Sequence, residues 1–100
     1  MEEAQSEFNR IPRNDDNLLL LDNYSFGIAL AHQEYLLVEV YSPKCPHCRN
    51  YSPIYKEAVK ALKPHNLDLE AAMLNGDLYD NKDFLHKYKI KGYPTTLLFR

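Results

Sequence analysis

The amino-acid sequence predicts an α/β fold, in which helices cover the faces of a central sheet. Short apolar runs alternate along the chain with segments of helical spacing, and this alternation is typical of α/β proteins. The length of 100 residues fits one domain. The composition, 45% hydrophobic and 26% charged, is that of an ordinary globular chain, so disordered, collagen-like and coiled-coil architectures are excluded.

The alternation begins and ends with a strand. We expect strands at residues 18–21, 36–41, 67–74 and 95–99, and helices at residues 25–33, 45–62 and 81–88. The first strand is a run of leucines that stops at Asp22, as expected for a buried strand. Ser25 then caps the first helix, which has Phe26, Ala29 and Leu30 on one face.

The later elements follow from apolar runs and one amphipathic stripe. The second strand is apolar except for Glu39. The long helix after it ends at Pro64. Its apolar stripe consists of Tyr51, Ile54, Tyr55, Ala58, Val59 and Leu62. The third strand carries Asp68 and Glu70 among its apolar residues, and a short helix and a last apolar strand complete the pattern.

Residues 1–17 differ in composition from the rest of the chain. They contain five acidic residues and two arginines, a net charge of −3, with few apolar residues and no periodicity. We therefore expect residues 1–17 to form a flexible acidic leader and residues 18–100 to form the folded domain.

The overall charge and the apolar runs argue against two classes of partner. The formal net charge is −2, so no basic excess is available to neutralise nucleic-acid phosphates. No apolar stretch approaches the roughly 20 residues that a membrane span needs. The chain starts Met1-Glu2-Glu3, without the basic start and apolar core of a signal peptide. We therefore expect either a cytosolic protein or a processed piece of a secreted one.

Two cysteines stand three residues apart, between the second strand and the long helix, as Cys45-Pro46-His47-Cys48. Proline favours the first helical position, so Cys45 is expected at the helix N-terminus. There the helix dipole and free amide groups stabilise a thiolate, with further positive potential from Lys44 and from protonated His47. Cys48 lies one turn further on, where it can resolve a mixed disulfide by attacking Cys45.

Two other interpretations of the cysteine pair remain open at this point. A single Cys-x-x-Cys is half of many zinc sites, but zinc needs four ligands and the histidines are scattered without ligand spacing. The two thiols could also be unreactive buried residues. Two cysteines are too few for a disulfide scaffold.

Glu39 is the one charged residue of the second strand. Alternation places it on the same face as Leu37 and Tyr41, in a strand that is otherwise apolar on both faces, so its carboxylate is expected to be buried. Burial raises a carboxyl pKa and makes the group a usable proton acceptor near neutral pH. The alternative is a surface residue on an edge strand.

Four motifs in order carry a resemblance to a known family. They are residues 35–43 (YLLVEVYSP), 45–48 (CPHC), 52–55 (SPIY) and 91–95 (KGYPT). Over roughly residues 18–100 the chain resembles the catalytic domain of protein disulfide isomerases, in the thioredoxin superfamily. The resemblance implies a thioredoxin-like fold, with a central mixed sheet flanked by helices. It also implies a redox-active Cys45–Cys48 disulfide with no other cofactor or metal, cysteine-containing client proteins, a thiol redox partner such as glutathione or an oxidase, and the endoplasmic reticulum lumen.

The resemblance also assigns roles to residues. Cys45 would attack, Cys48 would resolve, and Glu39, six residues before Cys45, would take the proton of Cys48. Pro53 matches a helix-kinking proline of the family. A loop with a cis proline would face the cysteines and pair with the backbone of an extended client. The substrate-binding rim would comprise Pro46, His47, Tyr93, Pro94 and Thr95.

Three features depart from the family pattern. Lys44 stands where isomerases carry tryptophan, and the Pro46-His47 pair is similar to that of the bacterial periplasmic oxidase, which favours an oxidising couple. Met73 aligns with a lysine that the family often places beside the buried acid. A fifth strand and a final helix, with a mobile arginine, do not follow the last strand, so we expect a C-terminally incomplete fold, either a fragment or a chain completed by a partner or by further domains.

The sequence therefore predicts an enzyme, a thiol–disulfide oxidoreductase or protein disulfide isomerase that acts through Cys45, Cys48 and Glu39. A non-catalytic thioredoxin-like module that binds clients or assembles with partners is one alternative, favoured by Lys44, Met73 and the incomplete end. A cytosolic thioredoxin-type reductase is the other.

Overall fold

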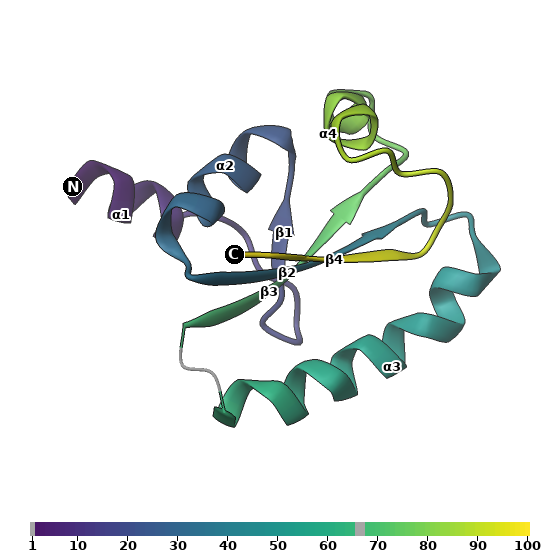
Figure 1. Cartoon of the computed structure of the whole chain (residues 1–100), viewed down its shortest axis with the longest axis horizontal. Helices are drawn as coiled ribbons and strands as arrows, with labels where there is room; N and C mark the ends of the chain where they lie inside the picture. Colours follow the sequence, from purple (N-terminus) through teal and green to yellow (C-terminus); the bar gives the residue numbers. More distant parts are fainter. Residues whose placement is uncertain (1, 66–67) are drawn as a thin grey trace.

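The computed structural model describes residues 2–65 and 68–100, with side chains described from Ser6 onward. A four-stranded sheet in the order β1-β3-β2-β4 lies between helices on both faces (Figure 1). The strands are β1 (Leu19–Leu21), β2 (Tyr35–Tyr41), β3 (Leu69–Asn75) and β4 (Thr95–Phe99). The helices are α1 (Glu2–Asn9), α2 (Asn23–His32), α3 (Pro46–Leu62) and α4 (Lys82–Lys87), with short 3-10 turns at Lys63–His65 and Tyr79–Asn81. The predicted α/β alternation from β1 to β4 is confirmed.

The sheet is mixed, as the resemblance implied. β3 runs parallel to both β1 and β2, whereas β4 runs antiparallel to β2. In this register Glu39 lies between Met73 on β3 and Thr96 on β4. β2 is therefore an inner strand, and Glu39 is fully buried, which rules out the alternative of a surface residue on an edge strand.

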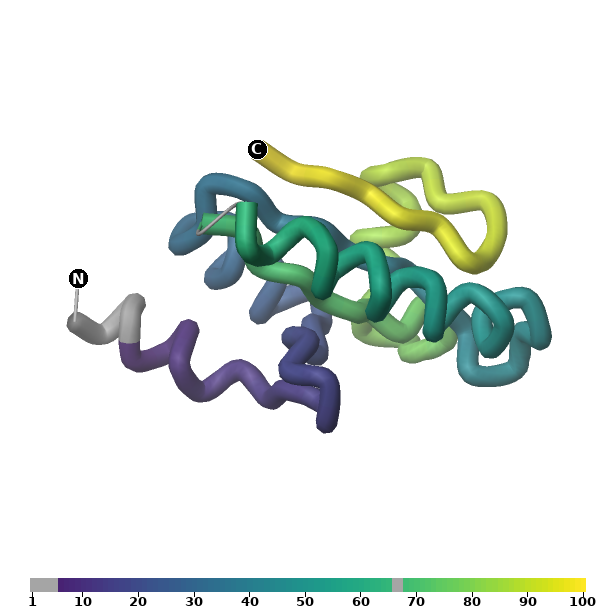
Figure 2. The backbone as a smooth tube through the Cα atoms, turned by 90° about the horizontal axis from the view of Figure 1, so that it is seen from below, coloured from purple at the N-terminus to yellow at the C-terminus, as the bar shows by residue number. Residues whose placement is uncertain are grey.

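The two faces of the sheet have separate cores. α1, α2 and α4 cover one face, and α3 lies along the other (Figures 1 and 2). On the first face Leu36, Val38 and Val40 of β2 pack in the larger apolar cluster. On the second face Leu37 packs with Tyr55 and other residues of α3. Successive residues of β2 thus enter different cores.

α3 is held against the sheet mainly by Tyr55. Its hydroxyl donates to the carbonyl groups of Leu37 (3.1 Å) and Ala72 (2.8 Å), so it links the helix to β2 and β3. Only part of the apolar stripe predicted for α3 is buried. Tyr55 and Val59 are buried, whereas Ile54 is 62% exposed. No helix among residues 2–65 and 68–100 is long and apolar enough to cross a membrane.

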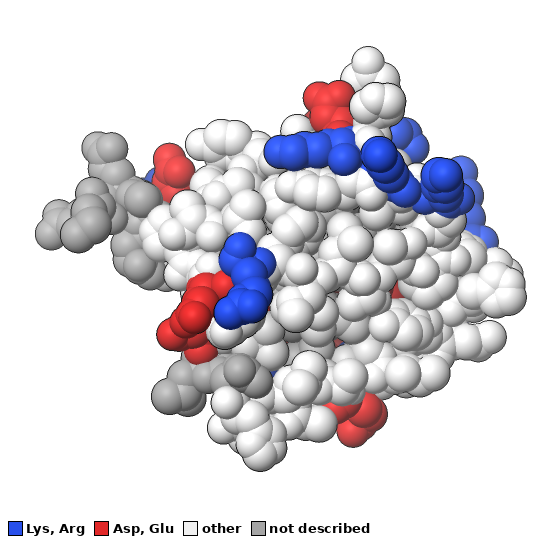
Figure 3. Space-filling view, in the orientation of Figure 1, with Lys and Arg blue, Asp and Glu red and all other residues white. Residues whose placement is uncertain are grey.

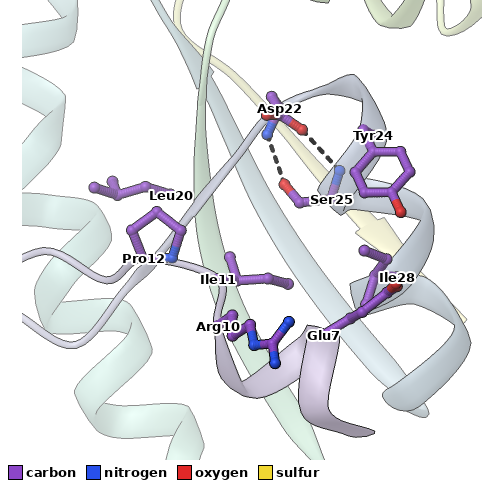
Figure 4. A pocket seen from close by; sticks show the side chains of 9 residues that line it. All are labelled: Glu7, Arg10, Ile11, Pro12, Leu20, Asp22, Tyr24, Ser25 and Ile28. Atoms are coloured by element: carbon purple, nitrogen blue, oxygen red, sulfur yellow. Dashed lines mark hydrogen bonds between the residues drawn. The ribbon is translucent and has the colours of Figure 1, made fainter. Parts of the chain in front are cut away.

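Several boundaries differ from the sequence-based expectations. Asp22, not Ser25, caps α2: the Asp22 carboxylate accepts from the Ser25 amide at 2.7 Å, and the Ser25 hydroxyl accepts from the Asp22 amide at 2.9 Å (Figure 4). This reciprocal capping box starts the helix two residues earlier than predicted. The third strand begins at Leu69, and residue 67 of the expected strand lies outside the described residues.

The structure contradicts the expectation of a loose leader at residues 1–17. Residues 2–9 form α1, and Phe8 and Ile11 are each only 7% exposed within the larger core. Arg13 pairs with Glu70 of β3 at 3.0 Å. Where this segment meets α2, its side chains line a cavity of about 280 Å³ (Figure 4). Two buried apolar residues are too few to produce a periodic pattern, so the sequence did not reveal this packing.

Candidate active site

Cys45 occupies the N-cap position of α3, as predicted. Its backbone is extended, with φ −92° and ψ 117°, and Pro46 follows at the start of the helix. The amide of Cys45 donates to the Ser42 carbonyl at 3.1 Å, and the amide of Cys48 donates to the Cys45 carbonyl at 3.1 Å. A turn between β2 and α3 thus presents one thiol at the end of the helix and keeps the other a turn further in.

The two thiols lie in different environments. Cys45 is partly exposed, whereas Cys48 is buried. The amide of Cys48, with smaller contributions from the Cys48 side chain and the His47 amide, lowers the pKa of Cys45. Burial raises the pKa of Cys48, and the nearby charges of Cys45 and Glu39 add to the increase. The arrangement gives an accessible thiol with a lowered pKa and a buried thiol with a raised pKa.

Glu39 is a buried acid without a protein partner. It is 0% exposed, and neither of its carboxylate oxygens has a hydrogen-bond partner among the described residues. Burial raises its pKa to about 7. Its neighbour on β3 is Met73, so the sheet places a thioether where a cation would lower that pKa.

One small cavity joins this acid to the second thiol. It has a volume of about 210 Å³, and both Glu39 and Cys48 line it, together with Ser42, Ser52 and Met73 among others. A buried polar group without a partner requires an explanation, and this carboxyl group shares its cavity with the second thiol.

The Tyr93–Pro94 loop faces the first thiol. The Tyr93–Pro94 peptide bond is cis, as the resemblance implied. The Cys45 thiol donates to the Tyr93 carbonyl at 3.8 Å, so residues 48 positions apart meet at the site. The Tyr93 ring lies against Gly76, where a Cβ atom would come within 2.5 Å of the ring. A side chain at position 76 would therefore require the Tyr93 ring to move.

The contact between Ser42 and Asp77 could not be predicted from the sequence. The Ser42 hydroxyl donates to the Asp77 carboxylate at 2.6 Å and accepts from the Lys44 amide at 3.3 Å. A serine three residues before the helix-capping position, and an aspartate just after a strand, are the only hints in the sequence. Nothing in their spacing connects them.

The residues expected to bind substrate surround the thiols, but their role remains a prediction. Pro46 and His47 lie at the start of α3, and Tyr93, Pro94 and Thr95 are partly exposed. The Thr95 hydroxyl donates to the Gly92 carbonyl at 2.7 Å. No group of three or more His, Cys, Asp or Glu side chains suited to a metal ion occurs among the described residues.

Charge is distributed unevenly over the surface. Lysine and arginine side chains gather over α4 and the segment that leads to β4 (Figure 3). That stretch of sequence contains the exposed residues Lys87, Lys89 and Lys91. The segment that leads into the Tyr93–Pro94 loop is therefore basic, although the chain as a whole is slightly acidic.

The mixed sheet, the thiol pair at the start of a helix and the facing cis-proline loop define a thioredoxin domain. The thioredoxin family matches residues 4–100, so the chain belongs to that family. The solution structure of the first thioredoxin domain of mouse Protein disulfide-isomerase A4 has a TM-score of 0.79 and 22% identity, and covers 91% of this chain and 63% of that chain.

Protein disulfide-isomerases are relatives in sequence as well. The Zea mays enzyme is 37% identical over 83 residues, which are 83% of this chain and 16% of the maize protein. The Oryctolagus cuniculus enzyme is 36% identical over 86 residues, 86% of this chain and 16% of the rabbit protein. The chain thus belongs to the thioredoxin family and spans about 16% of the length of these two relatives.

Proposed function

We propose that this chain catalyses thiol–disulfide exchange on cysteine-containing client proteins, as an oxidoreductase or isomerase. The observation that carries the proposal is that two neighbouring thiols differ in exposure and in the direction in which their pKa values are shifted. One is accessible and acidified by backbone amides, and the other is buried beside a carboxyl group that shares its cavity. Exchange chemistry needs this asymmetry, because one thiol must react with clients and the other must wait to release them.

In the reducing direction the electrons pass from the dithiol to the client. The Cys45 thiolate attacks one sulfur of a client disulfide, a new sulfur–sulfur bond forms, and the other client sulfur leaves as a thiolate. Cys48 then loses its proton and attacks the Cys45 sulfur, which breaks the mixed disulfide and releases the second client thiolate. The client is reduced by two electrons and the Cys45–Cys48 pair is oxidised. The reverse sequence oxidises a client dithiol.

Glu39 would act as the proton acceptor for Cys48. With a pKa of about 7 it exchanges protons readily near neutral pH. It lines the same cavity of about 210 Å³ as Cys48, which has room for water that could carry the proton between them.

Clients would bind across the Tyr93–Pro94 loop and the start of α3. The Tyr93 carbonyl already accepts from the Cys45 thiol, so the backbone there lies beside the reacting sulfur. An extended client could pair with this backbone through main-chain hydrogen bonds, with Pro46, His47, Pro94 and Thr95 forming the rim. Recognition through the backbone would suit a broad range of clients.

Replacing each cysteine separately tests the proposal. Cys45→Ser should abolish exchange, measured as the reduction of a fluorescent disulfide peptide, because the accessible thiol is lost and the remaining thiol, Cys48, is buried. Cys48→Ser should still attack but accumulate mixed disulfides with the peptide, visible by mass spectrometry. Turnover by the Cys45→Ser variant at the wild-type rate would rule out the proposed chemistry.

We further propose that the chain works in the endoplasmic reticulum lumen, with glutathione or a thiol oxidase as redox partner. The support is the similarity to protein disulfide-isomerases, and the reduction potential of the Cys45–Cys48 couple tests it. A value of about −180 to −120 mV in glutathione buffers would support an oxidase or isomerase of the secretory pathway. A value of about −270 mV or below would contradict this proposal and favour a reductase.

A further inference from the structure

The turn that carries Cys45 is organised around one side chain. Ser42 is 5% exposed, and its carbonyl accepts from the Cys45 amide at 3.1 Å. Its hydroxyl accepts from the Lys44 amide at 3.3 Å and donates to Asp77 at 2.6 Å. One serine thus holds the two residues that end the turn and ties them to a carboxylate 35 positions away in the sequence.

The carboxylate end of this contact is fixed as well. The Asp77 amide donates to the Asn75 side chain at 2.9 Å. Next to it, the Gly76 amide donates to the Tyr41 carbonyl at 2.7 Å, and the Lys82 ammonium donates to the Gly76 carbonyl at 2.9 Å. Asp77 is therefore held on a short loop beside the end of β2, although the residue is exposed.

Asp77 is the aspartate whose charge acts on the dithiol. The pKa of Cys45 is lowered overall, chiefly by the Cys48 amide, and the negative charge of Asp77 is the smallest of the influences on it and opposes that lowering. The pKa of Tyr93 is raised first by burial and then by the charge of Asp77. The other ionisable groups around the two thiols, from the turn, α3, β2 and the Tyr93–Pro94 loop, are Lys44, His47, Arg49, Glu39, Tyr41 and Tyr93.

We propose that Asp77, held by the Ser42 hydroxyl, is a positioning residue of the dithiol site that keeps a negative charge on the turn that carries Cys45 and makes the couple less oxidising than its Cys-Pro-His-Cys motif suggests. The inference rests on the proposed exchange function, whose reactive thiol it concerns. A carboxylate that disfavours the Cys45 thiolate destabilises the reduced form of the couple. The disulfide is then more stable relative to the dithiol, and the reduction potential is lower. The chain thus combines an oxidising motif with a local charge that moderates it.

The test follows the reactivity of Cys45 itself, without requiring turnover. The rate of alkylation by iodoacetamide is measured against pH on the whole chain, with Cys45 modification read by mass spectrometry. Asp77→Asn keeps the shape and an acceptor for Ser42 but removes the charge. Asp80→Asn is the matched control, since it removes the same charge from an exposed aspartate of the neighbouring turn.

Asp77→Asn should raise the alkylation rate of Cys45 at about pH 6 roughly threefold, and the gain should shrink in about 1 M salt because the effect is electrostatic. Asp80→Asn should change the rate little. In glutathione buffers the Asp77→Asn couple should shift toward the dithiol. An Asp77→Asn profile that coincides with that of Asp80→Asn, or a gain that salt leaves unchanged, would overturn the proposal.

The role of Ser42 is tested by repeating the comparison in a Ser42→Ala background. If Ser42 positions the charge, the roughly threefold effect of Asp77→Asn should largely disappear there, and it should return with Ser42→Thr, which keeps the hydroxyl. An undiminished effect of Asp77→Asn in the Ser42→Ala background would show that Ser42 does not position the carboxylate. If the wild-type chain has no exchange activity, the proposed function fails, but the alkylation profiles still decide this inference.

Discussion

The two faces of the sheet do different work. On the face covered by α2 and α4, the core contains a cluster of aromatic rings, with Phe84 4.9 Å from Phe26 and 4.8 Å from Tyr88 between ring centroids. On the face covered by α3, the core contains a carboxyl group with no protein partner among the described residues. The first face stabilises the fold mainly through apolar contacts. The second contains a buried carboxyl group, which lowers stability but could take part in proton transfer.

Successive residues of β2 contribute side chains to the two opposite faces of the sheet. Val38 and Val40 are fully buried in the aromatic side, while Glu39 between them is fully buried in the α3 side. Because strand side chains alternate, a shift of one residue would exchange the two sets. A single strand can thus place a proton acceptor beside the cysteines without disturbing the larger core.

The largest effect should come from breaking the aromatic face. Phe84 is 1% exposed, so Phe84→Ala should lower the free energy of unfolding by about 3–5 kcal/mol. That is a large share of the stability of a small domain, which is about 5–15 kcal/mol. Urea unfolding followed by circular dichroism measures the loss.

Tyr79→Ala is the control for Phe84→Ala, because Tyr79 is 87% exposed and its loss should cost little. Phe84→Ala should also leave the alkylation of Cys45 unchanged under conditions where the variant is folded. If it altered the pH profile of Cys45 while folded, the separation of the two faces would be wrong.

The sequence predicted those parts of the site that depend on local spacing. Two-residue alternation was enough to predict that Glu39 is buried. The proline after Cys45 was enough to predict that this thiol lies at the start of a helix. The cis bond before Pro94 and the place of Met73 beside Glu39 came from the resemblance. These features can be predicted from residues that are close in the sequence or from a motif of the family that the chain resembles.

The features that the sequence did not predict depend on distant contacts or on very few residues. The Ser42–Asp77 contact spans 35 positions, so no local pattern signals it. The N-terminal segment packs through Phe8 and Ile11, too few residues for a period to emerge. Serine is a common cap, which predicts a helix start at Ser25, but Asp22 takes that role in the structure and Ser25 completes its capping box.

A smaller, pH-dependent effect should come from the α3 face. The pKa of Glu39 is raised from 4.5 to about 7, so the folded chain holds a proton that the unfolded chain releases. The contribution of Glu39 to stability should therefore be greatest below about pH 4.5 and fall as the pH rises to 7 and above, by about 3 kcal/mol in total. Glu39→Gln should lack this loss, so it should match the wild type at about pH 4 and be more stable at about pH 8, as measured by urea unfolding.

Glu39→Gln should also slow exchange. A variant that gains stability at about pH 8 but loses exchange rate would separate the role of Glu39 in catalysis from its effect on stability. Without the proton acceptor, release of the mixed disulfide should slow roughly tenfold or more, which is less than the roughly 10²–10⁴-fold typical of general acid–base catalysis, because thiols also ionise unaided. Met73→Lys is the matched variant: its cation would face Glu39 across the strands and lower the pKa of the carboxyl, so its activity profile should extend to lower pH. A Glu39→Gln variant that gains no stability at about pH 8 and loses no rate would mean that the buried carboxyl serves neither purpose, and the contrast between the two faces would fail at its central residue.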